Sequence, residues 1–259
     1  MNNQPPTITT IDEVIAALDQ IISESKQNSS PLGYFAALYR KVTIRVKEGV
    51  EEKNPEKQVF QDNERMERLD VIFASRYISA YYGYQNNAPI TESWLIAFEM
   101  SNDFWPIVLQ NLLIGMNAHI NLDLGIAAAE VMKGKDLQDL KHDFNAINKI
   151  LSSLVEEVEE DLSKIWPTLK KLLKWTKKVD DFLIDFSMTA ARKDAWRFAE
   201  QLASLNGEGF ENAIANKDVK VAKIAKLITD PGFIASFIFK IIRLGEIGSV
   251  EQKIVDLEN

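Results

Sequence analysis

The sequence predicts an all-α protein, and three observations lead to that prediction. Nearly every periodic segment of the 259 residues repeats its apolar side chains at helical spacing. No pair of alternating segments joined by a hairpin turn is visible, and no repeat period occurs. We therefore expect a single compact domain over residues 1–259, with roughly nine or ten helices around a central apolar helix at about 104–131. Residues 1–9 are expected to form a flexible tail.

Caps, prolines and polar loops divide the first part of the chain into four helices. Thr10 is the expected cap of the first helix, and Pro31 is expected to open the second. The second helix turns an apolar face inward, and Trp94 lies on the apolar face of the fourth. The inward residues of the second helix are Phe35, Leu38, Tyr39, Val42 and Val46. The four helices run from Ile11 to the SKQNSSP loop, from Pro31 to the polar loop 51–63, from Glu64 to Tyr84, and from Thr91 past Phe98.

The central apolar helix comes next, and further helices follow it. Asn102, Asp103 and Pro106 are expected to begin the central helix, which fades near Gly134. The later helices are expected from Asp136 to about Glu160, from Pro167 onward, from Asp180 or Asp181 through Leu205, from Val219 to Thr229, and from Phe233 to Leu244. The apolar run FIASFIFKII at 233–242 is expected to lie in the core rather than at a dimer face.

Composition excludes several classes of protein. The chain has no cysteine, so disulfides, cysteine nucleophiles and cysteine-bound zinc are excluded. A net charge of −8 argues against nucleic acid as a partner. The start MNNQPPTITT lacks a signal peptide, and polar residues interrupt the longest apolar run, so we expect a cytoplasmic protein without a membrane span. The sequence does not indicate an oligomeric state.

Polar residues interrupt the central helix within GMNAHINLDL, residues 115–124. Helical spacing places His119 and Asp123 on one face, and Asn117 and Asn121 on nearly the opposite face. Burying such groups costs on the order of several kcal/mol unless each finds a hydrogen-bond partner, a counter-charge or a metal. The stretch therefore predicts a functional site.

Three interpretations of His119 and Asp123 stay open. They are ligands of a single divalent metal ion, a hydrogen-bonded pair of the core, or a catalytic acid and base. A metal site would take its further ligand from Asp143 or His142. Asp143, which begins an apolar stripe of the next helix, is the third catalytic candidate.

Other polar residues on apolar stripes are candidates for a supporting role. Asp70 and Arg76 are each expected to pair with an opposite charge across helices. Asn148 is expected to point inward toward the central helix. The residues expected to bind a ligand or to support the catalytic residues are Asn117, Asn121, Asn148, Asp70, Arg76, Tyr77, His142, Arg192 and Trp196.

Four segments together resemble a known family. They are RLDVIFASRY at 68–77, GMNAHINLDL at 115–124, DFNAIN at 143–148 and RKDAW at 192–196. The combination is similar to a bacterial family catalogued as domain-of-unknown-function family 5995, over about residues 33–243. That family implies an all-helical fold and no established activity. The pair His119 and Asp123 also resembles one ligand pair of all-helical zinc-dependent phospholipases C and single-strand nucleases, but two histidines cannot supply their three-zinc site.

Two functions fit these observations. The first is an enzyme that acts on a small apolar or amphipathic substrate through the buried His/Asp/Asn site, with or without one metal ion. The second is a non-catalytic protein that binds a small molecule or another protein, with the polar cluster as a structural hydrogen-bond network. A cavity that reaches His119 would support a ligand site.

Overall fold

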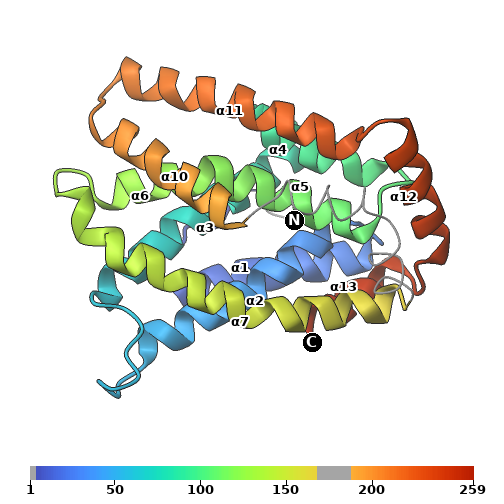
Figure 1. Cartoon of the computed structure of the whole chain (residues 1–259), viewed down its shortest axis with the longest axis horizontal. Coiled ribbons are helices and arrows are strands. Elements are labelled where there is room, and N and C mark those ends of the chain that lie inside the picture. Colours follow the sequence, from blue (N-terminus) through green and yellow to red (C-terminus); the bar gives the residue numbers. More distant parts are fainter. Residues whose placement is uncertain (1–3, 168–187) are drawn as a thin grey trace.

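The structure is a computed structural model that describes residues 4–167 and 188–259. Within these two ranges it contains eleven α-helices and no strand, so the all-α prediction is confirmed (Figure 1). The helix predicted to begin at Pro167 falls almost wholly outside the described residues, as does the predicted helix start at Asp180 or Asp181.

The first four helices lie close to their predicted positions. The Thr10 side chain caps the first helix by accepting from the Glu13 backbone, and the Glu13 carboxylate accepts from the backbone of Thr10. Just before this helix, the Thr9 backbone and hydroxyl also donate to Glu13, and Ile8 packs against the core. The four helices are α1 (Ile11–Gln27), α2 (Leu32–Glu51), α3 (Asn63–Gln85) and α4 (Glu92–Glu99).

The later helices differ more from the prediction. The helix expected from Asp136 begins at Lys141 instead, because Asp136 caps a short 3-10 turn, η3 (Leu137–Leu140), and it runs on past Glu160. The helix expected from Val219 begins at Glu208, and a helix at the end of the chain was not predicted. The observed helices are α7 (Lys141–Ile165), α10 (Met188–Ala203), α11 (Glu208–Thr229), α12 (Phe233–Gly245) and α13 (Val250–Glu258).

The central helix consists of two α-helices joined by a π-turn. α5 (Val108–Ala118) and α6 (Leu124–Val131) flank η2 (His119–Asp123), whose five residues are all buried. The predicted central helix is confirmed, but it begins at Val108 rather than near 104, because the backbone of Ile107 is still extended. In Figure 1 the central stretch runs through the middle of the molecule, with α10 and α11 on one side and α1, α2 and α7 on the other.

The central stretch also has the length and composition of a membrane helix. Among the described residues, Val108–Val131 is the one helical stretch that meets both criteria. Its most apolar window is 94% buried inside the protein, so neighbouring helices cover its apolar side chains. The absence of a membrane span stays a prediction.

Two glycines let neighbouring helices approach the central stretch closely. A Cβ atom on Gly115 would lie 2.5 Å from the Phe35 ring of α2, and one on Gly125 would lie 2.8 Å from the backbone oxygen of Ala195 in α10. Such short distances admit only glycine without a shift of the neighbour. The glycines therefore bring α2 and α10 against the helix that carries His119.

One face of α12 departs from the prediction that 233–242 lies in the core. Phe239 and Ile242 are buried, but Phe233 is 89% exposed and Phe237 is 60% exposed. A single helix with apolar residues on all sides can bury only the face that meets the rest of the protein. The prediction is therefore wrong for the outer face of this helix.

Candidate functional site

The candidate site begins at the π-turn of the central helix. The backbone N–H of Leu124 donates to the carbonyl of His119, five residues earlier in the chain. Such turns are rare and frequently occur at functional sites. His119 and Asp123 still meet on one face, with 3.5 Å between Nδ1 and Oδ2. The candidate residues therefore lie in a local distortion of the helix that their spacing did not predict.

Asp123 is a buried carboxylate surrounded by nitrogen donors. Arg76 Nε donates to Oδ1 at 2.7 Å, and Trp94 Nε1 donates to Oδ2 at 2.8 Å. Burial by itself raises the pKa of Asp123, but the hydrogen bonds from His119 and Trp94 and the charge of Arg76 outweigh burial and lower that pKa. Asp123 is therefore ionised, and the predicted pairing of Arg76 with a carboxylate across helices is confirmed.

The imidazole of His119 lies among aromatic rings. It stacks on Phe73 with the ring centroids 3.5 Å apart, and the Tyr39 ring lies edge-on at 4.4 Å. Burial lowers the pKa of His119, so the ring is neutral at pH 7. Since an ionised Asp123 accepts only from an Nδ1–H tautomer, Nε2 carries a lone pair. No described residue forms a hydrogen bond with this buried nitrogen.

A cavity of about 450 Å³ adjoins His119. Mostly apolar side chains line it, from α2, α3, the central helix, α7 and α10. Three buried polar atoms of its lining residues have no hydrogen-bond partner in the described chain: the Tyr39 hydroxyl, Asp70 Oδ2 and His119 Nε2. Buried polar atoms normally have partners, and the volume is that of a small-molecule site. The cavity is therefore the candidate ligand site.

Asp70 brings a titratable group to the cavity wall. Burial, with a smaller contribution from the charge of Glu67, raises the pKa of Asp70 to about 7. Within residues 4–167 and 188–259 no cation pairs with Asp70, so the predicted ion pair is wrong for this residue. Its environment is apolar, and Arg76 on the same helix reaches Asp123 instead. Near neutral pH the carboxyl group is divided between its protonated and ionised forms.

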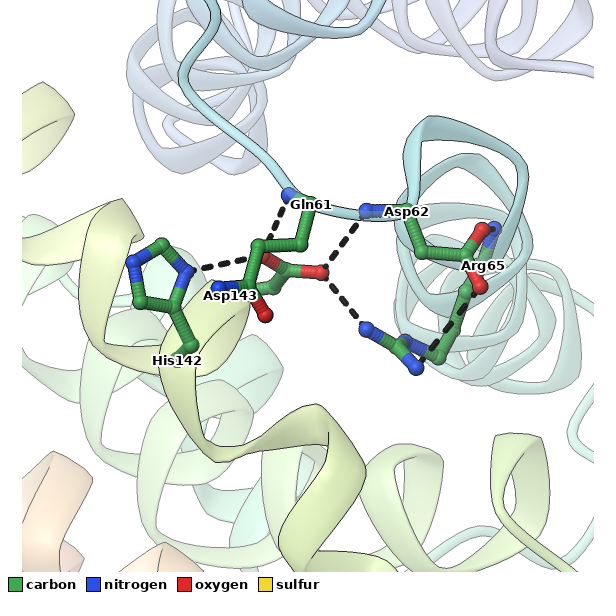
Figure 2. Close-up of polar contacts among 5 residues, drawn as sticks. All are labelled: Gln61, Asp62, Arg65, His142 and Asp143. Carbon is green, nitrogen blue, oxygen red and sulfur yellow. Dashed lines mark hydrogen bonds and ion pairs between the residues drawn. The ribbon is translucent and has the colours of Figure 1, made fainter.

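Asp143 lies in a different cluster, shown in Figure 2. Its Oδ1 accepts from the Gln61 backbone at 2.7 Å and lies 3.1 Å from His142 Nδ1. Its Oδ2 accepts from the Asp62 backbone at 3.1 Å and from Arg65 Nη2 at 2.7 Å. These contacts join the first turn of α7 to the start of α3 and the loop before it. Asp143 is not among the described residues that line the cavity, and its four partners account for its burial.

Among the supporting candidates, Asn148 and Arg192 line the cavity, as Asp70 does. Arg192 Nε donates to Asn148 Oδ1 at 2.7 Å. The two asparagines of the central helix form a separate pair, in which Asn121 donates to Asn117 at 3.0 Å. Asn117 in turn donates to a backbone carbonyl of α11 at 3.0 Å. This pair fixes the position of α11 against the central helix.

Three further candidates do not line the cavity, although the Tyr77 ring lies 6.2 Å from the ring of His119. Tyr77 packs edge-on against Phe35, with the ring centroids 5.1 Å apart. Trp196 donates to Glu200 at 2.7 Å, and the side chain of His142 is 58% exposed. None of Tyr77, Trp196 and His142 is among the described residues of the cavity wall.

The donor set does not fit a metal ion. The described residues contain no group of three or more histidine, aspartate or glutamate side chains placed to hold one. Both oxygens of Asp123 already accept from N–H donors, and Arg76 supplies the counter-charge. A metal at His119 would meet a single nitrogen within an aromatic enclosure. The geometry therefore gives the metal interpretation no support.

Two residues of the site were not predicted to belong to it. Tyr39 and Trp94 appear in the sequence as members of apolar faces. Each carries one polar atom that needs a hydrogen-bond partner when the side chain is buried. That requirement is the sequence signal that could have identified them as site residues. In the structure Trp94 holds Asp123 and Tyr39 lines the cavity.

Comparisons with known proteins place the chain in a family. No curated protein and no solved structure matches it. The model of one family matches residues 11–231, earlier at both ends than the predicted span of about 33–243. The chain therefore belongs to the family of unknown function DUF5995.

Proposed function

We propose that this protein binds a small apolar or amphipathic molecule in the cavity beside His119. The observation that carries the proposal is the coincidence of an apolar cavity of about 450 Å³ with three unpartnered buried polar atoms. Ligand sites combine an apolar lining with a few polar groups that orient the ligand. The proposed ligand places a hydroxyl or N–H donor at His119 Nε2, and its apolar part fills the rest of the space.

The polar atoms of the cavity have complementary roles toward such a ligand. His119 Nε2 accepts a hydrogen bond, because Asp123 holds the proton on Nδ1. Burial raises the pKa of Tyr39 well above 10, so its hydroxyl stays protonated and is able to donate. Asp70 donates when protonated and accepts when ionised. A ligand that reaches these atoms would therefore meet both a donor and an acceptor.

A cavity-filling substitution tests ligand binding. Val42 lines the cavity on α2, and Val219 is a 47% exposed valine on α11. The neutral fluorescent probe N-phenyl-1-naphthylamine should bind the wild type and lose at least about tenfold in affinity in Val42→Trp, because the indole occupies its space. Val219→Trp makes the same chemical change at the surface and should bind like the wild type. Equal affinity in the wild type and both variants would refute the proposed site.

Catalysis by His119 is a second candidate, and the oriented imidazole favours it. An ionised aspartate at Nδ1 with a free lone pair at Nε2 is the arrangement by which histidine serves as a general base. In this cavity His119 Nε2 would take a proton from a water or hydroxyl group that attacks the substrate. Asp70, which lines the same cavity and has a pKa raised to about 7, would return a proton to the leaving group.

Ester hydrolysis provides a test of the catalytic candidate. His119→Asn keeps an amide donor toward Asp123 but removes the nitrogen at the Nε2 position. With 4-nitrophenyl decanoate as substrate, we expect turnover above the buffer rate and a loss of about 100-fold in His119→Asn. His142→Asn, at the exposed histidine, serves as the matched control and should keep full activity. If the wild type hydrolyses the ester no faster than buffer does, ester hydrolysis is refuted and the proposed binding function is unaffected.

A further inference from the structure

Arg192, in the second turn of α10, is a buried cation on the wall of the cavity. The residue is 6% exposed. Its Nε donates to Asn148 Oδ1 at 2.7 Å, and its Nη2 donates to the carbonyl of Phe144. The guanidinium carbon lies 4.5 Å from the centre of the Phe144 ring. All of these contacts are with neutral groups.

The other buried cations show how unusual this environment is. In the part of the chain that the structure describes, four lysine and arginine residues are buried. Three of them form ion pairs with carboxylates: Lys41 with Asp161, Arg65 with Asp143, and Lys253 with Glu246. Arg192 has no such partner in the described residues, and burial lowers its pKa to about 10. A buried charge without a counter-charge is costly, so its presence calls for an anion.

The described part of the cavity wall provides no such anion. Within residues 4–167 and 188–259 its acidic lining residues are Asp70 and Glu159, and neither forms an ion pair with Arg192. Asp70 is close to half protonated at neutral pH, and Glu159 is exposed. The Nη1 group of Arg192 has no described hydrogen-bond acceptor. The guanidinium therefore keeps donor capacity for a molecule in the cavity.

We infer that Arg192 recognises an anionic group, and that the molecule bound in the cavity is an apolar chain or ring system carrying a carboxylate or a phosphate. The inference rests on the proposed function and adds a substrate class to it. The planar guanidinium fork matches both oxyanions, and Asn148 holds it in place through Nε. The ligand thus meets a fixed positive charge from α10 and a hydrogen-bond acceptor, His119 Nε2, from the central helix.

Calorimetric titration with probes of one chain length tests this inference. The probes are dodecanoate, dodecyl phosphate and dodecanol below their aggregation limits, together with inorganic phosphate. The wild type should bind at least one anionic probe about ten- to 100-fold more tightly than dodecanol, because a charge-assisted bidentate contact contributes about 1.5–3 kcal/mol. Dodecanoate and dodecyl phosphate distinguish a carboxylate ligand from a phosphate ligand.

Two substitutions and a matched control assign the preference to Arg192. Arg192→Met and Arg192→Gln should lose the preference for anions and keep the affinity for dodecanol, which also shows that the cavity is intact. Arg192→Gln keeps a donor for the Phe144 carbonyl if the methionine variant does not fold. Arg197→Met, at an exposed arginine of the same helix, should behave like the wild type.

The outcomes separate this inference from the proposed function. If dodecanol binds as tightly as both anions, or if both neutral variants keep the preference, Arg192 is not an anion site and the apolar cavity stands. If inorganic phosphate binds as tightly as dodecyl phosphate, the inference that the ligand has an apolar part is wrong. If no probe binds, the proposed function and this inference fail together.

Discussion

Two clusters in this protein contain the same residue types and differ in the burial of the histidine and in their position relative to the cavity. In the first, Asp143 meets His142, Arg65 and two backbone N–H groups (Figure 2). In the second, Asp123 meets His119, Arg76 and an indole N–H. In the second cluster His119 has a buried nitrogen, Nε2, without a described partner, and His119 lines the cavity.

The Asp143 cluster is a structural joint between α7 and the start of α3, and the His119 cluster is the candidate site. A buried network that lies away from the cavity stabilises the contact between the elements that contribute to it, although Arg65 Nε in the Asp143 cluster is also buried without a described partner. A buried network that ends in an unpartnered atom at a cavity wall retains the capacity to bind something. The Asp143 cluster should therefore control stability, and the His119 cluster should control binding.

The largest expected effect is the loss of stability in Asp143→Ala. The substitution leaves Arg65 with only its longer, 3.6 Å ion pair to the exposed Asp62, and it leaves two backbone N–H groups without acceptors. Removing one partner of a buried ion pair costs about 3–5 kcal/mol in the free energy of unfolding. Urea denaturation measures this loss, and Asp139→Ala, an exposed aspartate in the turn before α7, should lie within about 0.5 kcal/mol of the wild type. A loss under about 1 kcal/mol would show that the cluster is not a structural joint.

The second prediction is a gain in stability, and it concerns Asp70 at the cavity. Its pKa is raised from 3.8 in the unfolded chain to about 7 in the folded protein. Below pH 4 both states hold the proton; between pH 4 and pH 7 only the folded state does, so stability falls as the pH rises. Asp70→Asn removes this dependence and should be more stable than the wild type at pH 8 by on the order of 2–4 kcal/mol.

Urea denaturation at pH 4 and at pH 8 checks the prediction for Asp70. The advantage of Asp70→Asn should be small at pH 4 and reach its full size above pH 7. Asp143 provides the contrast, because its hydrogen bonds lower its pKa despite its burial, and its contribution to stability is lost as the pH falls. An advantage that is the same at both pH values would contradict the raised pKa of Asp70.

The spacing of residues along the sequence was enough to predict the side-chain pairs of the central helix. The pairs His119 with Asp123 and Asn117 with Asn121 are four residues apart, so a helix alone brings each pair together. Most helices were predictable for the same reason. The π-turn was not, because the segment 119–123 carries no proline or glycine that marks a break in the helix.

Long-range packing explains what could not be predicted. The cavity wall combines α2, α3, the central helix, α7 and α10, and its shape depends on gaps between side chains far apart in the sequence. Asp70 and Asp143 both lie on apolar stripes, and no local signal shows that one has four partners and the other has none in the described chain. Only the packing of the helices distinguishes them.

The smallest expected effect is that of His142→Ala in the Asp143 cluster. The His142 side chain is 58% exposed, and its contact with Asp143 is one of four. Exposed charged contacts of this kind contribute about 0–1 kcal/mol, and alanine is at least as favourable in the first turn of α7. We expect an unfolding free energy within about 0.5 kcal/mol of the wild type and unchanged probe binding. A larger loss of stability would mean that Asp143 depends on its histidine as Asp123 does, and the distinction between the two clusters would then rest on the cavity alone.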